Sequence, residues 1–262
     1  MMAAWGVVSW LIWRTKISYV ERNKVVVRGY RLDELIGRVS YGEMLYLMFN
    51  GELPPREWRR ALDALLVAGC DHSIFCPSTS AARIVASGGV GLQNAIASGI
   101  NAMGSYHGGA IEAAMKLFYE VKARGDEVGL EKAAEEAVSK LLAEGKRVPG
   151  FGHKIHTDDP RVKRLLEVAG ECGLDRGYIK AALEVGIALE KAGRRLPMNI
   201  DGAMAAVACE LGFDWRAGRA IFVLSRALGV AAHAYEEMVE GEPFKEIPLE
   251  EIRYEGPRER EL

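Results

Sequence analysis

Helical periodicity covers almost the whole chain after Gly29, and it restricts the fold more than any other feature. Apolar residues recur every three or four positions in segments that end at glycines or begin at prolines, as amphipathic helices do. The sequence predicts helices over residues 41–50, 54–68, 78–86, 92–101, 108–124, 130–143, 160–172, 178–192, 202–211 and 215–239. One β-branched run, residues 24–28, predicts a strand closed by Gly29. We therefore expect a mostly α-helical protein with a short β element near its beginning.

Composition excludes several classes of function. The 262 residues carry a formal net charge of −2, so no overall basic field favours nucleic acid or an anionic membrane as a partner. The four cysteines form no CxxC pair, which favours reduced thiols and a cytoplasmic location. Residues 1–13 are apolar and uncharged, but they are too short to span a bilayer and lack the leading positive charges of a secretory signal. We expect them to pack as an arm over an interface.

Four of the five histidines lie in short, glycine-rich segments, and imidazoles held on turns suit proton transfer. His107 precedes Gly108 at the expected mouth of a helix, where the helix dipole disfavours further positive charge. A neutral imidazole there can donate a hydrogen bond to a developing enolate oxygen; a capping or structural histidine is the alternative. Asp201 precedes the helix expected from Gly202, where it is either a general base or an N-cap.

His153 and His156 follow the segment Gly150-Phe151-Gly152 and precede two aspartates, residue types that also bind metals. The glycines before them and the proline after them argue against the regular helix that would hold an i, i+3 pair. No third histidine is near in sequence, so we expect no metal. The segment is not a dinucleotide fingerprint either, because the third glycine is missing.

Two arginines are candidates for binding an anion, Arg161 and Arg226. Arg226 lies in the middle of a predicted apolar helix, with His233 two turns further on, and a charge in that setting needs a partner. The partner is either a buried acidic residue of this chain or a substrate carboxylate held by the planar guanidinium. The pairs 146–147 and 194–195 are also basic, and they are either surface charges or partners for phosphates.

Taken together and in order, these segments resemble the citrate synthase superfamily. The resemblance runs from about Trp13 to near the C-terminus, and each motif alone is weak whereas their joint order is specific. It is carried by Arg28-Gly29-Tyr30, Gly51-Glu52-Leu53-Pro54, His72 with Ser78-Thr79 and Arg83, His107-Gly108-Gly109-Ala110, Gly150-Phe151-Gly152-His153, Asp159-Pro160-Arg161, Asn199-Ile200-Asp201 and Ser225-Arg226-Ala227-Leu228-Gly229.

The resemblance implies a citrate-synthase-like helical fold with large and small subdomains. Residues 1–145 would form the first part of the large domain, residues 146–215 a small subdomain that binds coenzyme A, and residues 216–262 a helix returning to the large domain. Sequence alone marks a boundary near Gly145 only weakly, without a linker or repeat.

The resemblance also implies roles for individual residues. Asp201 would be the acid or base at the acetyl methyl carbon, His107 would stabilise the acetyl-CoA enolate, and His153 would exchange a proton with the oxygen on the oxaloacetate-derived carbon. The dicarboxylate would be bound by His72, Arg161, Arg226 and, from a second subunit, Arg258 or Arg260. Coenzyme A would contact Val148, Gly150, Phe151, Gly152, Lys154, Arg194 and Arg195.

Two departures from typical citrate synthases bear on the reaction. The chain is much shorter, with the missing stretch between Leu65 and His72, and its ending at residues 254–257 differs. In both respects, and in the segment Trp13–Ser18, the chain looks more like citryl-CoA lyases and the related module at the carboxyl end of ATP-citrate lyase. A citryl-CoA lyase is our first hypothesis, a compact citrate or 2-methylcitrate synthase the second, and a non-catalytic subunit that binds CoA or citrate the third.

The partners expected from the resemblance are small molecules: citryl-CoA, acetyl-CoA, and oxaloacetate or citrate. The CoA thioester would be substrate or product, with no permanently bound cofactor. A homodimer or higher homo-oligomer is expected, because the family completes its site across a subunit interface and two-fold dimers are the commonest symmetry.

Overall fold

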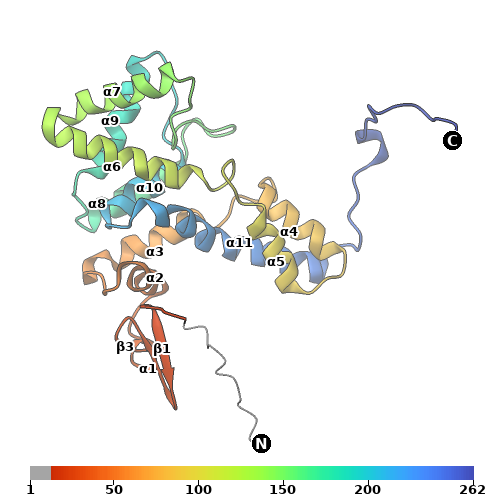
Figure 1. The fold of residues 1–262 in the computed structure, drawn as a ribbon, viewed down its shortest axis with the longest axis horizontal. Coiled ribbons are helices and arrows are strands. Elements are labelled where there is room, and N and C mark those ends of the chain that lie inside the picture. The colour runs from red at the N-terminus through yellow and green to blue at the C-terminus, as the bar shows by residue number, and fades with distance from the viewer. Residues whose placement is uncertain (1–12) are drawn as a thin grey trace, which may run out of the picture.

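The computed structural model describes residues 13–262, so the expected arm falls almost entirely outside the described residues. The predicted strand is β2 (Lys24–Val27), which is confirmed. It pairs antiparallel with β1 (Ser18–Glu21) and β3 (Tyr30–Arg31), in the order β1-β2-β3. The sheet and the short α1 (Leu32–Leu35) lie beyond α2, at one end of the helical body (Figure 1). Periodicity missed β1 and β3 because they are short and exposed, with no buried face to pattern.

The rest of the described chain is helical, as predicted, and each of the ten expected helices has a counterpart. A short 3-10 helix precedes α3 (Arg56–Trp58), another precedes α11 (Trp215–Ala217), and a third lies in the C-terminal segment (Leu249–Glu251). The main helices are α2 (Tyr41–Asn50), α3 (Arg59–Ala68), α4 (Pro77–Ser87), α5 (Leu92–Asn101), α6 (Ala110–Val128), α7 (Leu130–Ala143), α8 (Pro160–Glu171), α9 (Tyr178–Lys191), α10 (Ile200–Glu210) and α11 (Gly218–Glu240). Among residues 13–262, no helix combines the length and apolar character needed to cross a bilayer.

Helix ends follow local signals where the signals are strong. Ser40 caps α2 through a capping box with Glu43, and Gly51 ends the helix in the left-handed conformation at φ 89°. Both ends of this helix agree with the prediction because a short-range hydrogen bond fixes each of them.

Helix α10 is the centre of the main core, since every residue from Gly202 to Glu210 is buried. Its small side chains let α6, α8 and α9 pack closely around it, and α7 packs on α6 and α9. Helix α11 links this core to a second, smaller one formed by its own C-terminal half with α4 and α5 (Figure 1). The main core runs without interruption across positions 145 and 215, and the subdomain boundaries expected there stay a prediction.

Candidate active site

The turn that carries Asp201 begins α10 two residues earlier than predicted. Asn199 is the N-cap, because its Oδ1 accepts the backbone N–H of Gly202 at 3.0 Å. Asp201 therefore lies in the first turn of the helix, and the N-cap role considered for it is wrong. Its carboxylate has no hydrogen-bond partner among residues 13–262, so it is free to act on a ligand.

The loop that carries His153 is clamped to this turn. Asn199 Nδ2 donates to Gly152 O at 2.8 Å, Asn199 N donates to Gly150 O at 3.0 Å, and Gly152 N donates to Pro197 O at 2.7 Å. Gly150 has φ +86°, and a Cβ there would lie 2.8 Å from Gly202 Cα. The two segments thus touch backbone to backbone, which fixes His153 relative to Asp201.

His107 lies in a turn closed by backbone hydrogen bonds with Gly104, at 2.8 and 3.1 Å. Helix α6 begins at Ala110 with Gly109 as N-cap, so His107 precedes the helix by more than predicted. The His107 Nε2 lies 2.8 Å from the Oγ of Ser78, a fully buried residue of α4. Ser78 was noted in the sequence only as part of a motif, and its role in orienting His107 required the structure.

His107 and Arg226 meet at one aromatic ring. The His107 ring stands edge-on to Phe222 at 5.8 Å, and the Arg226 guanidinium lies 5.2 Å from the same ring centroid. Arg226 is only 3% exposed; its Nε donates to Gly69 O at 2.8 Å and its Nη1 lies 3.2 Å from Cys76 Sγ. No acidic side chain of the described residues pairs with it, so this buried charge is available to a ligand carboxylate.

Arg161 offers a second cationic group. Two of its nitrogens bind Asp159, which also caps α8, whereas its buried Nη1 has no partner among residues 13–262. Arg161, His72 and His156 line an open pocket of about 530 Å³ together with Asp71, Ser73, Phe75, Ile155, Asp159 and Pro160. The structure therefore brings the predicted dicarboxylate ligands Arg161 and His72 to one cavity.

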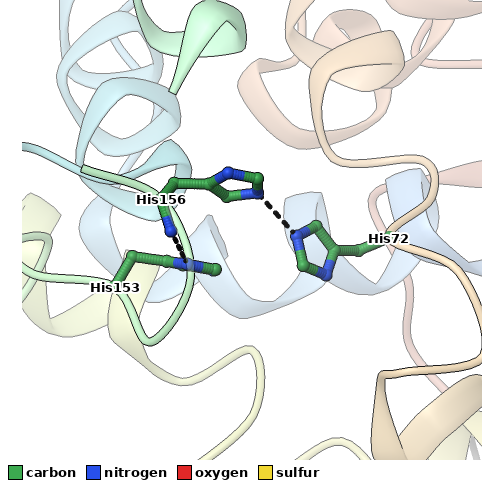
Figure 2. A group of neighbouring side chains, drawn as sticks. All are labelled: His72, His153 and His156. Carbon is green, nitrogen blue, oxygen red and sulfur yellow. Dashed lines mark hydrogen bonds between the residues drawn. The ribbon is translucent and has the colours of Figure 1, made fainter. Parts of the chain in front are cut away.

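His72, His153 and His156 form an imidazole cluster (Figure 2). The Nε2 atoms of His72 and His156 are 3.2 Å apart, and the rings of His153 and His156 stack at 4.6 Å. The backbone N–H groups of Ile155 and His156 both donate to His153 Nδ1, each at 3.0 Å. One nitrogen of each ring lies within 4.8 Å of the others, so the third histidine missing from the sequence neighbourhood is supplied by His72. The expected absence of a metal stays a prediction.

Burial and positive neighbours set the charge of these groups. Burial raises the pKa of Asp201, against the opposing effect of Arg226 and Arg161. Burial, with the charges of Arg226 and His72, lowers the pKa of His107. The pKa values of His72 and His153 are lowered as well, mainly by burial. The site thus favours a protonated carboxyl group and neutral imidazoles.

A second pocket, of about 520 Å³, is lined by His153. Five residues expected to contact coenzyme A line it, namely Val148, Phe151, Gly152, Lys154 and Arg194. Lys146 and Arg147 line it too, and no acidic residue does, so the pocket suits a ligand that carries phosphates.

Three expected ligand residues lie elsewhere. Gly150 packs against the first turn of α10 instead of lining the pocket, and Arg195 projects into solvent with its side chain 89% exposed. Arg258 lies in the exposed C-terminal segment, which extends away from the helical body (Figure 1). His107, Asp201 and Arg226 line neither of these two pockets.

Comparisons with known proteins found similar sequences and similar folds. The family described as "Citrate synthase, C-terminal domain" matches residues 54–247. Citrate synthase 1 of Mycobacterium tuberculosis is 33% identical over 195 residues, which are 70% of this chain and 44% of that protein. The chain thus spans less than half the length of this curated relative.

Two solved structures are similar over nearly the whole chain. Citryl-CoA lyase from Hydrogenobacter thermophilus is 39% identical with a TM-score of 0.89, covering 96% of this chain and 98% of that one. ATP citrate lyase from Methanothrix soehngenii, in complex with citrate and coenzyme A, has a TM-score of 0.84 and covers 97% of this chain and 43% of that one. It is 23% identical, so this likeness is one of fold alone. The expected fold is confirmed.

Proposed function

Because this chain belongs to the citrate synthase family, we propose that it is a citryl-CoA lyase, which cleaves citryl-CoA to acetyl-CoA and oxaloacetate. The observation that carries the proposal is Asp201, a half-buried carboxyl group with a raised pKa and no hydrogen-bond partner among residues 13–262, in the field of Arg226, which has no acidic partner among the same residues. The 39% identity to a citryl-CoA lyase, along nearly the full length of both chains, supports the choice of reaction.

Asp201 would be the acid of the cleavage. When the bond between the citryl carbon and the acetyl methylene breaks, its electron pair remains on the acetyl fragment as an enolate. Because burial raises the pKa of this carboxyl group, its protonated form, which can give a proton to this carbon, is favoured. His107 would donate a hydrogen bond to the enolate oxygen from Nδ1, since Ser78 occupies the Nε2 side.

The dicarboxylate fragment would be held by guanidinium groups. Within residues 13–262, Arg226 has no acidic partner and Arg161 Nη1 has no hydrogen-bond partner, so each can bind a carboxylate oxygen without breaking an ion pair seen there. His153 would donate from Nε2 to the oxygen on the oxaloacetate-derived carbon, because its Nδ1 accepts two backbone N–H groups. The CoA phosphates would lie near Lys146, Arg147 and Arg194 at the basic pocket.

A direct assay in both directions tests the proposal. The lyase should convert citryl-CoA to oxaloacetate, measured through coupled reduction by NADH and malate dehydrogenase, and Asp201→Asn should reduce this rate by about 10²–10⁴-fold. A compact citrate or 2-methylcitrate synthase is the second candidate, favoured by the identity to Citrate synthase 1. Turnover of acetyl-CoA or propionyl-CoA plus oxaloacetate to free CoA, without cleavage of citryl-CoA, would identify it instead. Absence of both activities in the wild-type protein would favour a subunit that only binds CoA or citrate, whereas unchanged activity in Asp201→Asn would assign catalysis to another residue.

We also propose that the protein is a homo-oligomer in which Arg258 completes the site of a neighbouring subunit. Its place in an exposed segment that leaves the helical body supports a role outside its own subunit. Arg258→Ala should raise KM for citryl-CoA, with Arg253→Ala in the same segment as control. A solution mass equal to one chain, together with an unchanged KM, would exclude this arrangement.

A further inference from the structure

His233 is the fifth histidine of the chain, and it lies outside the imidazole cluster. It is half-buried on α11, two turns after Arg226. Its Nε2 lies 3.2 Å from Asp71 Oδ1, and its buried Nδ1 has no hydrogen-bond partner among residues 13–262. Because a carboxylate only accepts hydrogen bonds, the neutral ring carries its proton on Nε2 and donates to Asp71. Within the described residues, the side chain of His233 thus makes its hydrogen bond to Asp71 alone.

Helix α11 holds the segment that follows α3. Residues of the helix, in chain order, contact residues of the segment that are also in chain order: Ser225 with Leu66, Arg226 with Gly69, Gly229 with Cys70, and His233 with Asp71. The contact at Gly229 is a close approach of two backbones, since a Cβ there would lie 2.2 Å from Cys70 O. The others are hydrogen bonds from side chains of the helix. His233 therefore makes the last of these contacts before the segment reaches His72.

The Asp71 carboxylate shapes the turn that carries His72. Its Oδ2 accepts the backbone N–H of Ser73 at 3.1 Å, whereas its Oδ1 accepts from His233. Burial alone would raise the pKa of Asp71, but the backbone N–H groups of Ser73 and His72 and the proximity of His233 lower it. On the other side of the turn, the His72 carbonyl has only a long contact with Cys76 Sγ, at 3.7 Å. Asp71 is therefore the group that ties the backbone of this turn to α11.

We propose that His233 is a positioning residue of the dicarboxylate site, which holds Asp71 so that the His72 ring faces the ligand. This inference rests on the proposed function, with His72 as a ligand of the dicarboxylate. His72 and Asp71 line the pocket that also contains Arg161, whereas His233 does not line it and acts through Asp71. Asp71 also brings a negative charge to this pocket, and the N–H of His233 offsets part of its repulsion of a dicarboxylate.

Substitutions of His233 test the inference through KM. His233→Leu removes the donor, and we expect KM for citryl-CoA to rise about tenfold with kcat changed less than about threefold, because a misplaced His72 weakens binding and not the chemical step. His233→Gln can donate to Asp71 from its amide and should return KM to within about threefold of wild type. Tyr119→Phe is the matched control, since it removes a 2.7 Å hydrogen bond to Phe213 O elsewhere in the core and should leave KM unchanged. An unchanged KM in His233→Leu, or an equal rise in KM in either of the other two variants, would overturn the inference.

A second measurement separates this inference from the lyase proposal itself. In ¹⁵N-labelled protein, the ring signals of His72 should move in His233→Leu and in Asp71→Ala, and should stay in place in Tyr119→Phe. Because both changes break the same contact, the double variant of His233 and Asp71 should move the signals no further than Asp71→Ala alone. If the wild-type protein does not cleave citryl-CoA, the lyase proposal fails. Moved His72 signals in His233→Leu would still support the positioning role in that case, and unmoved signals would refute it.

Discussion

Asn199→Ala should separate what the clamp between the His153 loop and α10 contributes to stability from what it contributes to the reaction. The substitution removes the N-cap of α10, a loss of about 1 kcal/mol, and the 2.8 Å hydrogen bond to Gly152 O, about 1 kcal/mol more. The free energy of unfolding should therefore fall by about 2 kcal/mol, which lowers Tm by roughly 4–8 °C in a chain of this size. Urea unfolding measures the first value and calorimetry the second.

The same substitution should lower kcat for citryl-CoA cleavage by about 10–100-fold, because His153 and Asp201 lose their common support. Ser40→Ala is the control, because it should lower the free energy of unfolding by a similar amount. It removes the N-cap of α2 and a 2.8 Å hydrogen bond to Asp63, far along the chain from His153 and Asp201. It should destabilise the protein by a similar amount and leave kcat unchanged. Equal losses of kcat in the two variants, or a change in stability below about 0.5 kcal/mol in Asn199→Ala, would refute this account of the clamp.

Three further changes have outcomes that the structure fixes in direction. Asp201→Asn should raise the free energy of unfolding at pH 7, because burial raises the pKa of Asp201 and so disfavours its charged form in the folded state; one pKa unit corresponds to about 1.4 kcal/mol. The folded state binds this proton more tightly than the unfolded state, so the difference in stability from wild type should shrink as the pH falls through the pKa of folded Asp201. Urea titrations at several pH values measure this difference. Ser78→Ala should reduce kcat about tenfold with little change in KM, since it frees the His107 ring; steady-state kinetics that show only a raised KM would contradict this. Gly150→Ala should lower the free energy of unfolding by about 2 kcal/mol or more, because a left-handed φ and a backbone clash combine. Gly129→Ala, at φ +90° with open space around it, should lower the free energy of unfolding by about 1 kcal/mol in the same assay.

Helix positions were predictable from sequence wherever one local signal decides them. The capping box of Ser40 and the left-handed Gly51 bound α2 at the predicted residues. The start of α10 was not predictable in this way, because Asn199 and Asp201 are both good N-caps. Asn199 is the N-cap because it also makes a second side-chain hydrogen bond, to Gly152 O, and that contact spans 47 positions in the chain.

The candidate site shows the same limit. Arg226 could be identified from one sequence, because a charge among apolar residues on a helix needs a special partner. The contact between His72 and His156 joins residues 84 positions apart, and no periodicity or spacing reports such a pair. For the same reason Ser78, which reaches His107 across 29 positions, stood out in sequence only as part of a resemblance.

The backbone contact between Gly150 and Gly202 has a consequence for how products could depart. It fixes the His153 loop to the first turn of α10, which carries Asp201, while His107 and Arg226 both contact Phe222 of α11. The acetyl fragment would touch Asp201 on the first of these parts and His107 on the second, and the keto acid would touch His153 and Arg226 in the same divided way. A displacement of the His153 loop and the α10 turn relative to Phe222 would then loosen both fragments together, so both products would leave after one movement.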